Sequence, residues 1–221
     1  MSSTADDRDH VHGKQPIHRA GAEPDEASAA MILVHGRGAT ARSILSLGEQ
    51  LDRPQLAMFA PQATNNTWYP RSFLSPLEQN QPHLDSALRR LDETVDEVLS
   101  EGIDAERLIL LGFSQGACLT SEYVARNPRR YGGVVALTGG VIGPDDTPRD
   151  YTGSLDGTPV FLGSSDPDPH VPVQRVELTA RIFEEMDADV TTEFYPGMAH
   201  TVCPDELDHT RRIVDGVIDG S

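Results

Sequence analysis

The sequence has no hydrophobic run long enough to cross a bilayer. Its longest apolar runs, such as Ala29–Val34, fall far short of the ~20 residues that a transmembrane helix needs. The first fourteen residues are polar and acidic, unlike the apolar centre of a secretory signal peptide. We therefore expect a cytoplasmic protein with no membrane partner. Residues 1–14 should form a flexible N-terminal tail, and residues 15–221 should form a single domain.

Lysine is almost absent. Lys14 is the only lysine, and 35 Asp and Glu residues against 18 Lys and Arg residues give a net charge of −17. Such a surface resembles that of halophilic proteins, in which salt screens the repulsion between carboxylates. A GC-rich genome would also favour arginine over lysine. In either case nucleic acid is a poor partner for this surface.

Cysteine is also scarce, with only Cys118 and Cys203 in 221 residues. His200 and Cys203 have the spacing of half a zinc site, but no second pair completes it. A disulfide would be unusual in an intracellular protein. We expect buried free thiols, no metal and no organic cofactor.

Short apolar runs alternate with amphipathic segments along the chain, which predicts a mostly parallel sheet with helices on both faces. An irregular loop covers residues 62–81, and no insertion is long enough to form a cap domain. The expected strands lie near residues 15–20, 30–35, 56–60, 107–111, 134–137, 159–162 and 190–195, and the helices near 40–51, 82–101, 115–127, 173–186 and 205–218.

A G-x-S-x-G motif places Ser114 between Gly112 and Gly116. It follows an apolar strand and precedes a helix that begins with small residues. This context is typical of a nucleophile elbow, in which glycines allow the strand and helix backbones to approach each other. The motif therefore predicts that Ser114 is a nucleophile and that the fold is an α/β-hydrolase fold.

A nucleophilic serine needs a base and an acid, which follow it in this fold in the order serine, acid, histidine. His200 lies on a loop behind a predicted strand, where catalytic groups gather in α/β sheets. His209 should be a surface residue of the last helix, and His170 can line the site. The acid should be Asp166 or Asp168, and physical reasoning alone does not separate them.

The first buried strand ends in His35-Gly36-Arg37-Gly38. A glycine-rich turn at this point can present the backbone N–H of Arg37 to the substrate oxyanion, and Gln115 can supply the second N–H. The side chain of Arg37 could contact an anionic group of the substrate, or it could pair with a nearby carboxylate.

Five motifs in this order resemble the phospholipase/carboxylesterase family of α/β hydrolases, which includes acyl-protein thioesterases. They are LVHGRG at 33–38, APQA at 60–63, LGFSQGA at 111–117, DPHVP at 168–172 and YPGMAH at 195–200. The resemblance extends from about Met31 to Ile218. The family's Asp-Pro-x-Val-Pro pattern selects Asp168 as the acid, although the usual distance from Gly163 would favour Asp166.

The chain departs from the thioesterases at two places. Arg37 stands where they often have leucine, and the loop at residues 66–74 is richer in aromatic residues. Trp68, Tyr69 and Phe73 could line a pocket for a short acyl or aromatic group, or the loop aromatics could simply cover the core.

The resemblance implies a serine carboxylesterase acting on a small ester through an acyl-enzyme. The alternatives are an acyl thioesterase or lysophospholipase with the same residues, and a non-catalytic binding module of the same fold. A dienelactone-type hydrolase is disfavoured because such enzymes typically have cysteine at the elbow. The sequence leaves the oligomeric state open, a homodimer included.

Overall fold

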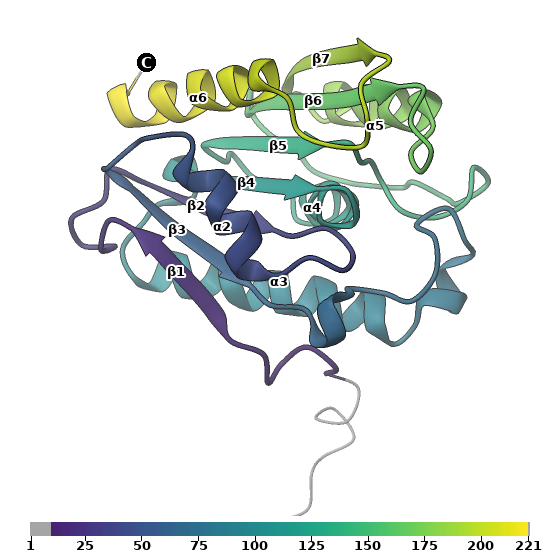
Figure 1. The fold of residues 1–221 in the computed structure, drawn as a ribbon, viewed down its shortest axis with the longest axis horizontal. Helices are drawn as coiled ribbons and strands as arrows, with labels where there is room; N and C mark the ends of the chain where they lie inside the picture. The colour runs from purple at the N-terminus through teal and green to yellow at the C-terminus, as the bar shows by residue number, and fades with distance from the viewer. Residues whose placement is uncertain (1–9, 221) are drawn as a thin grey trace, which may run out of the picture.

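A computed structural model describes residues 10–220. They form one seven-stranded sheet, with the strand order β1-β3-β2-β4-β5-β6-β7, and helices that pack on it (Figure 1). Only β1, at one edge, is antiparallel to its neighbour. The strands are β1 Ile17–Gly21, β2 Ala29–Val34, β3 Leu56–Pro61, β4 Leu108–Phe113, β5 Gly133–Leu137, β6 Pro159–Asp166 and β7 Asp189–Pro196. The α-helices are α2 Ala41–Glu49, α3 His83–Ser100, α4 Gln115–Arg126, α5 Val173–Glu185 and α6 Pro204–Asp219.

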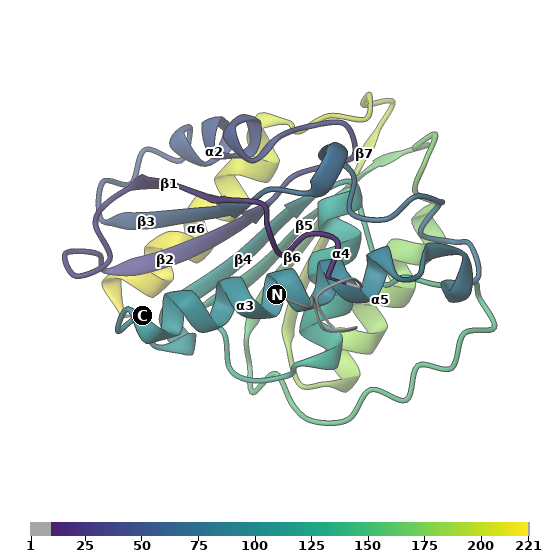
Figure 2. The same cartoon turned by 90° about the horizontal axis from the view of Figure 1, so that it is seen from below.

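Helices cover both faces of the sheet, and each face has its own hydrophobic core. Figure 2 shows α3, α4 and α5 on one side and α2 on the other; α6 shares the core of α2. Alternate residues of β2 enter the two cores, Ile32 on the α3–α4 side and Leu33 on the α2–α6 side. This two-sided burial explains why the strands read as continuous apolar runs. The predicted α/β-hydrolase fold is confirmed, and no cap covers the sheet within residues 10–220.

Two segments differ from expectation. Strand β6 continues to Asp166, four residues past its predicted end at Leu162, because its last residues pair with β7 as far as Pro196. The connection at 138–158 has no regular helix or strand, yet residues 138–143 are buried against the core. Elsewhere the predicted elements agree with the structure to within about two residues. Within the described part of the chain, every helix is too short or too polar to cross a membrane.

The expected flexible tail lies only partly within the described residues, which begin at His10. Residues 10–14 form a turn that packs on the domain, and His12 is completely buried. Its Nδ1 accepts the N–H of Thr64 at 3.1 Å, so Nε2 carries the proton and donates to the carbonyl of Trp68 at 2.9 Å. The ring therefore links the N-terminal segment to the 62–81 loop.

His12 predicts a specific pH dependence of stability. Burial lowers the pKa of His12 to about 4. Between pH 6.5 and 4 the unfolded chain binds a proton that the folded protein does not, so the unfolding free energy falls as pH falls. The full loss from this group is about 3 kcal/mol. Replacing His12→Gln, which keeps one donor and one acceptor, should remove that part of the dependence.

Urea denaturation of both proteins at pH 7, 5.5 and 4.5 measures the effect. We expect the free energy of unfolding to fall less steeply in the variant than in the wild type. Equal slopes would show that His12 does not resist protonation in the folded state.

Candidate active site

Ser114 occupies a sharp turn between the end of β4 and the first residue of α4. Its backbone has φ 55° and ψ −117°, a strained conformation for a residue with a side chain. A Cβ atom added at Gly112 would lie 2.3 Å from the carbonyl oxygen of Gly116. One added at Gly116 would lie 2.0 Å from the carbonyl oxygen of Val34. Glycine is therefore required on both sides of Ser114, and the turn holds its Oγ at the carboxyl edge of the sheet.

Three side chains from separate loops form a continuous hydrogen-bonded chain. His200 Nε2 lies 2.8 Å from Ser114 Oγ, and His200 Nδ1 lies 2.8 Å from Asp168 Oδ2. The imidazole sits between the rings of Phe113 and His170, with centroid distances of 5.3 and 5.0 Å. Both ring nitrogens are thus engaged, which permits proton transfer from the serine on one side and orientation by the carboxylate on the other.

The structure brings Asp168, and not Asp166, to the histidine. Asp168 also accepts hydrogen bonds from Ser165 Oγ and from the backbone N–H groups of His170 and Val171, at 2.7 to 2.9 Å. Burial alone would raise its pKa, but these bonds and the one from His200 lower the pKa of Asp168 to about 2. The carboxylate is therefore ionised throughout the neutral range. Asp166 is exposed at the end of β6.

Both residues expected to supply the oxyanion N–H groups line the same pocket as Ser114. Gln115 is the first residue of α4, where a backbone N–H has no acceptor within its own helix and the helix dipole favours negative charge. Arg37 follows Gly36 in the turn after β2. A Cβ added at Gly36 would lie 3.3 Å from Ser114 Cβ, so this turn passes close to Ser114.

Within the described residues, the side chain of Arg37 binds backbone carbonyls and not a nearby carboxylate, which was one of the two alternatives from the sequence. Its guanidinium donates to the backbone carbonyls of Tyr69, Pro70 and Arg71 at 2.9, 3.0 and 2.6 Å. Gln115 binds the same loop: its Oε1 accepts the N–H of Trp68 and its Nε2 donates to the carbonyl of Tyr69, both at 2.9 Å. The side chains of both candidate oxyanion residues therefore hold residues 68–71 in place.

A pocket of about 400 Å³ opens beside Ser114 and His200. Tyr69, Phe73 and His170 line it, as the sequence suggested for a substrate site. Sequence reasoning missed five further lining residues, which are Pro70, Arg71, Ser72, Cys118 and Val171. Most of these are immediate neighbours of predicted residues, and position along the chain could have suggested them.

Trp68 does not belong to the residues that line this pocket. It is fully buried, and its Nε1 donates to the carbonyl of His35 at 2.9 Å. Its ring packs against the rings of His12 and His35. For Trp68 the structure supports the alternative that the loop aromatics cover the core. Cys118 and Cys203 are free thiols, the first buried and the second half-buried.

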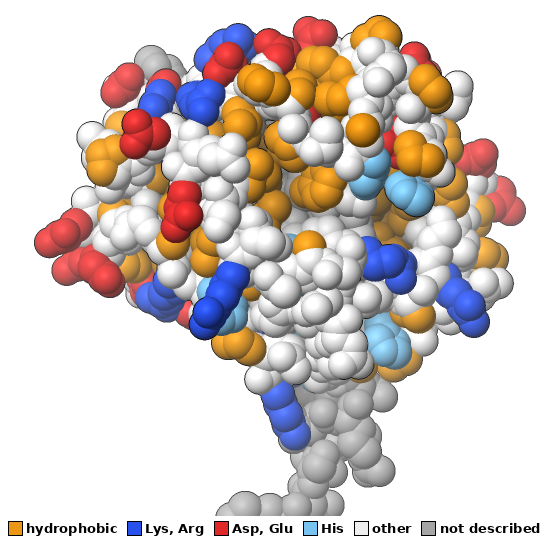
Figure 3. Space-filling view, in the orientation of Figure 1, with side chains coloured by type: hydrophobic (Ala, Val, Ile, Leu, Met, Phe, Trp, Pro, Cys, Tyr) orange, Lys and Arg blue, Asp and Glu red, His pale blue; other side chains and the backbone are white. Residues whose placement is uncertain are grey.

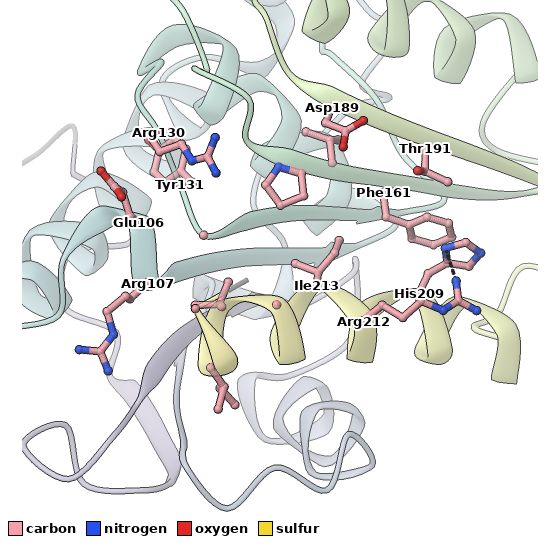
Figure 4. Close-up of a pocket in the computed structure, with 17 residues that line it drawn as sticks. Glu106, Arg107, Arg130, Tyr131, Phe161, Asp189, Thr191, His209, Arg212 and Ile213 are labelled. Carbon is pink, nitrogen blue, oxygen red and sulfur yellow. Dashed lines mark hydrogen bonds between the residues drawn. The ribbon is translucent and has the colours of Figure 1, made fainter.

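A larger cavity, of about 850 Å³, lies away from these residues (Figure 4). The starts of β5, β6 and β7 and the second half of α6 line it, so it lies at the opposite edge of the sheet from the serine. His209 borders this cavity and stacks on Phe161 with a centroid distance of 4.3 Å. It lies in the last helix, as expected, but it is half-buried instead of fully at the surface.

A mostly parallel sheet with a serine elbow, and with the acid and histidine following in that order, defines the α/β-hydrolase class of serine hydrolases. The sequence profile described as Phospholipase/Carboxylesterase matches residues 18–218. The chain therefore belongs to the phospholipase/carboxylesterase family.

Individual relatives agree with this assignment. A crystal structure described as a phospholipase/carboxylesterase from Dyadobacter fermentans is 47% identical, with a TM-score of 0.87, and covers 91% of this chain and 96% of its own. Acyl-protein thioesterase 1 of Saccharomyces cerevisiae is 36% identical over 126 residues, 56% of this chain and 55% of the yeast protein. The match thus spans about half of that relative. Acyl-protein thioesterase 1 of Debaryomyces hansenii is 27% identical over 92% of this chain and 97% of its own length.

Proposed function

We propose that this protein is a carboxylesterase that hydrolyses short-chain or aromatic esters through an acyl-enzyme intermediate. The observation that carries the proposal is the hydrogen-bonded chain from Asp168 through His200 to Ser114, at 2.8 Å for each step, beside an open pocket. The family gives the reaction class, and the geometry supports the role that we propose for each residue.

In the proposed reaction Ser114 Oγ attacks the ester carbonyl while His200 Nε2 accepts its proton. Asp168 stabilises the imidazolium that forms. The N–H groups of Arg37 and Gln115 bind the oxyanion. His200 then protonates the departing alcohol oxygen as its bond to carbon breaks. Water repeats the sequence on the acyl-enzyme and releases the acid.

The pocket wall supports a small acyl group. Tyr69 and Phe73 are among the residues that line the pocket, and both are buried. Five hydrogen bonds between the backbone of residues 68–71 and the side chains of Arg37 and Gln115 hold this segment. A wall held in this way cannot move aside for a long chain without breaking several of those bonds, so we propose that acyl groups of a few carbons fit best.

Acyl thioesterase activity is the second candidate, and the names of the fungal relatives support it. The same three residues would act, since a thioester and an ester pass through the same acyl-enzyme. We also propose a cytoplasmic location, in keeping with the two free thiols.

A series of p-nitrophenyl esters from acetate to decanoate tests the proposal, at low and at molar KCl. We expect kcat/KM to be highest for acetate to butyrate and to fall for octanoate and decanoate. Comparing ethyl and S-ethyl butyrate then separates the esterase from the thioesterase. A rate that rises up to decanoate would contradict the proposed acyl size, and a strong preference for the thioester would favour the second candidate.

A further inference from the structure

A second hollow of about 430 Å³ borders the catalytic residues, and the proposed reaction does not yet use it. Figure 3 shows hydrophobic side chains gathered in a hollowed part of the face that carries α2 and α6. The second hollow is lined by the turn after β2, by α2, by the end of β4 and by the start of α6 with the residues just before it. The lining residues are His35, Gly36, Ala39, Ser43, Ile44, Leu47, Gln50, Phe113, Thr201, Val202, Cys203, Pro204 and Leu207.

The two hollows share no lining residue, yet they meet along the catalytic loops. Gly36 lines the second hollow and Arg37 the first. In the same way Phe113 precedes Ser114, and Thr201 follows His200. The turn after β2, the turn at Ser114 and the loop at His200 therefore contribute lining residues to both hollows.

We propose that the second hollow binds the alcohol part of the ester, and we name it the alcohol pocket. This inference rests on the proposed esterase function. The acyl carbonyl must contact Ser114 and the N–H groups of Arg37 and Gln115, and all three residues line the first pocket. The departing alcohol must receive its proton from His200, and the residues directly after His200 line the second hollow.

The lining of the alcohol pocket specifies an apolar alcohol. It contains Ile44, Leu47, Phe113 and other apolar side chains, and it contains no Asp, Glu, Lys or Arg. His35, its one imidazole, is fully buried, and burial lowers its pKa, which favours the neutral form. A charged headgroup such as that of a lysophospholipid would lose its hydration here without gaining a partner. Aryl and alkyl alcohols fit this chemistry.

The matched variants Leu47→Trp and Ser46→Trp test the inference. Leu47 is half-buried and lines the alcohol pocket, whereas Ser46 is exposed on the same helix and does not line it. Acetate esters of methanol, butanol, phenol and 2-naphthol vary only the alcohol. We expect Leu47→Trp to lower kcat/KM at least about tenfold for the naphthyl ester. The methyl ester should change less than about twofold, and Ser46→Trp should leave the whole series unchanged.

A second variant, Ala39→Phe, fills the same hollow from the turn before α2 and should give the same pattern. Thermal melts identify any variant that fails to fold, in which case the other one decides. An equal loss across all alcohols would overturn the inference, as would a loss that depends on acyl length instead. If the esterase proposal itself is wrong, the wild type will hydrolyse none of the esters. That outcome can be told apart from the two that overturn only the alcohol pocket.

Discussion

Replacing Ser114→Ala is expected to lower kcat/KM for p-nitrophenyl butyrate by roughly four to six orders of magnitude. The substitution removes only the hydroxyl group, which is the proposed nucleophile and lies 2.8 Å from His200 Nε2. The fold should survive, because alanine places the same Cβ in the strained turn and Ser114 Oγ has no bond to the backbone. The melting temperature should stay within about 3 °C of the wild type.

Ser72→Ala is the matched control for this variant. Ser72 lines the same pocket, but it does not contact the histidine. Its replacement should change kcat/KM by less than about threefold. A Ser114→Ala protein that keeps a tenth or more of the wild-type rate would remove this serine from the mechanism.

Replacing Asp168→Asn should lower kcat roughly 10³- to 10⁴-fold with little change in KM. All four groups that contact the carboxylate donate hydrogen bonds to it. An amide puts its own donor where an acceptor is needed, so His200 loses its orientation and the imidazolium loses its counter-charge. The low pKa of Asp168, about 2, shows how strongly the site favours the ionised form.

Asp166→Asn is the control, because Asp166 lies two residues away and is exposed. This variant should keep at least half of the wild-type kcat. A larger loss in Asp166→Asn than in Asp168→Asn would reverse the assignment of the acid. Steady-state kinetics on both proteins, with circular dichroism to verify folding, measures the difference.

The fold was readable because burial on both faces leaves a strong signal in the sequence. Runs such as residues 29–34 and 56–61 stand out as apolar, and amphipathic segments separate them. The end of β6 gives no such signal, since its extension to Asp166 depends on pairing with β7, more than twenty residues further along. The sequence of residues 138–158 likewise has no periodic pattern that predicts the burial of this connection, because that burial comes from tertiary contacts.

Chain order and local motif were enough to predict that Ser114 and His200 would lie together, and the structure places their side chains in contact. Asp166 and Asp168 were separated only by a family pattern. Trp68 and Tyr69 show the limit of sequence reasoning: adjacent aromatic residues in an irregular loop have no periodicity that says which one faces a pocket. Trp68 turns to the core because its indole N–H binds the carbonyl of His35, 33 residues earlier in the chain.

The side-chain contacts of Arg37 were also beyond prediction. Its three acceptors are backbone carbonyls. Every residue has a backbone carbonyl, so no residue type in the sequence marks these acceptors. The alcohol pocket has the same character. Its lining comes from residues 35–50, Phe113 and residues 201–207, which only the folded sheet brings together.

Labelling with a fluorophosphonate probe tests the central claim most directly, because the probe reacts with an activated serine whatever the natural substrate is. Intact mass measurement and peptide mapping should show one label per chain, on Ser114, with loss of ester hydrolysis in proportion to labelling. Asp168→Asn should react far more slowly, and Asp166→Asn should react at the wild-type rate. A folded protein that takes up no label, or takes it up at another residue while it still hydrolyses esters, would contradict the account.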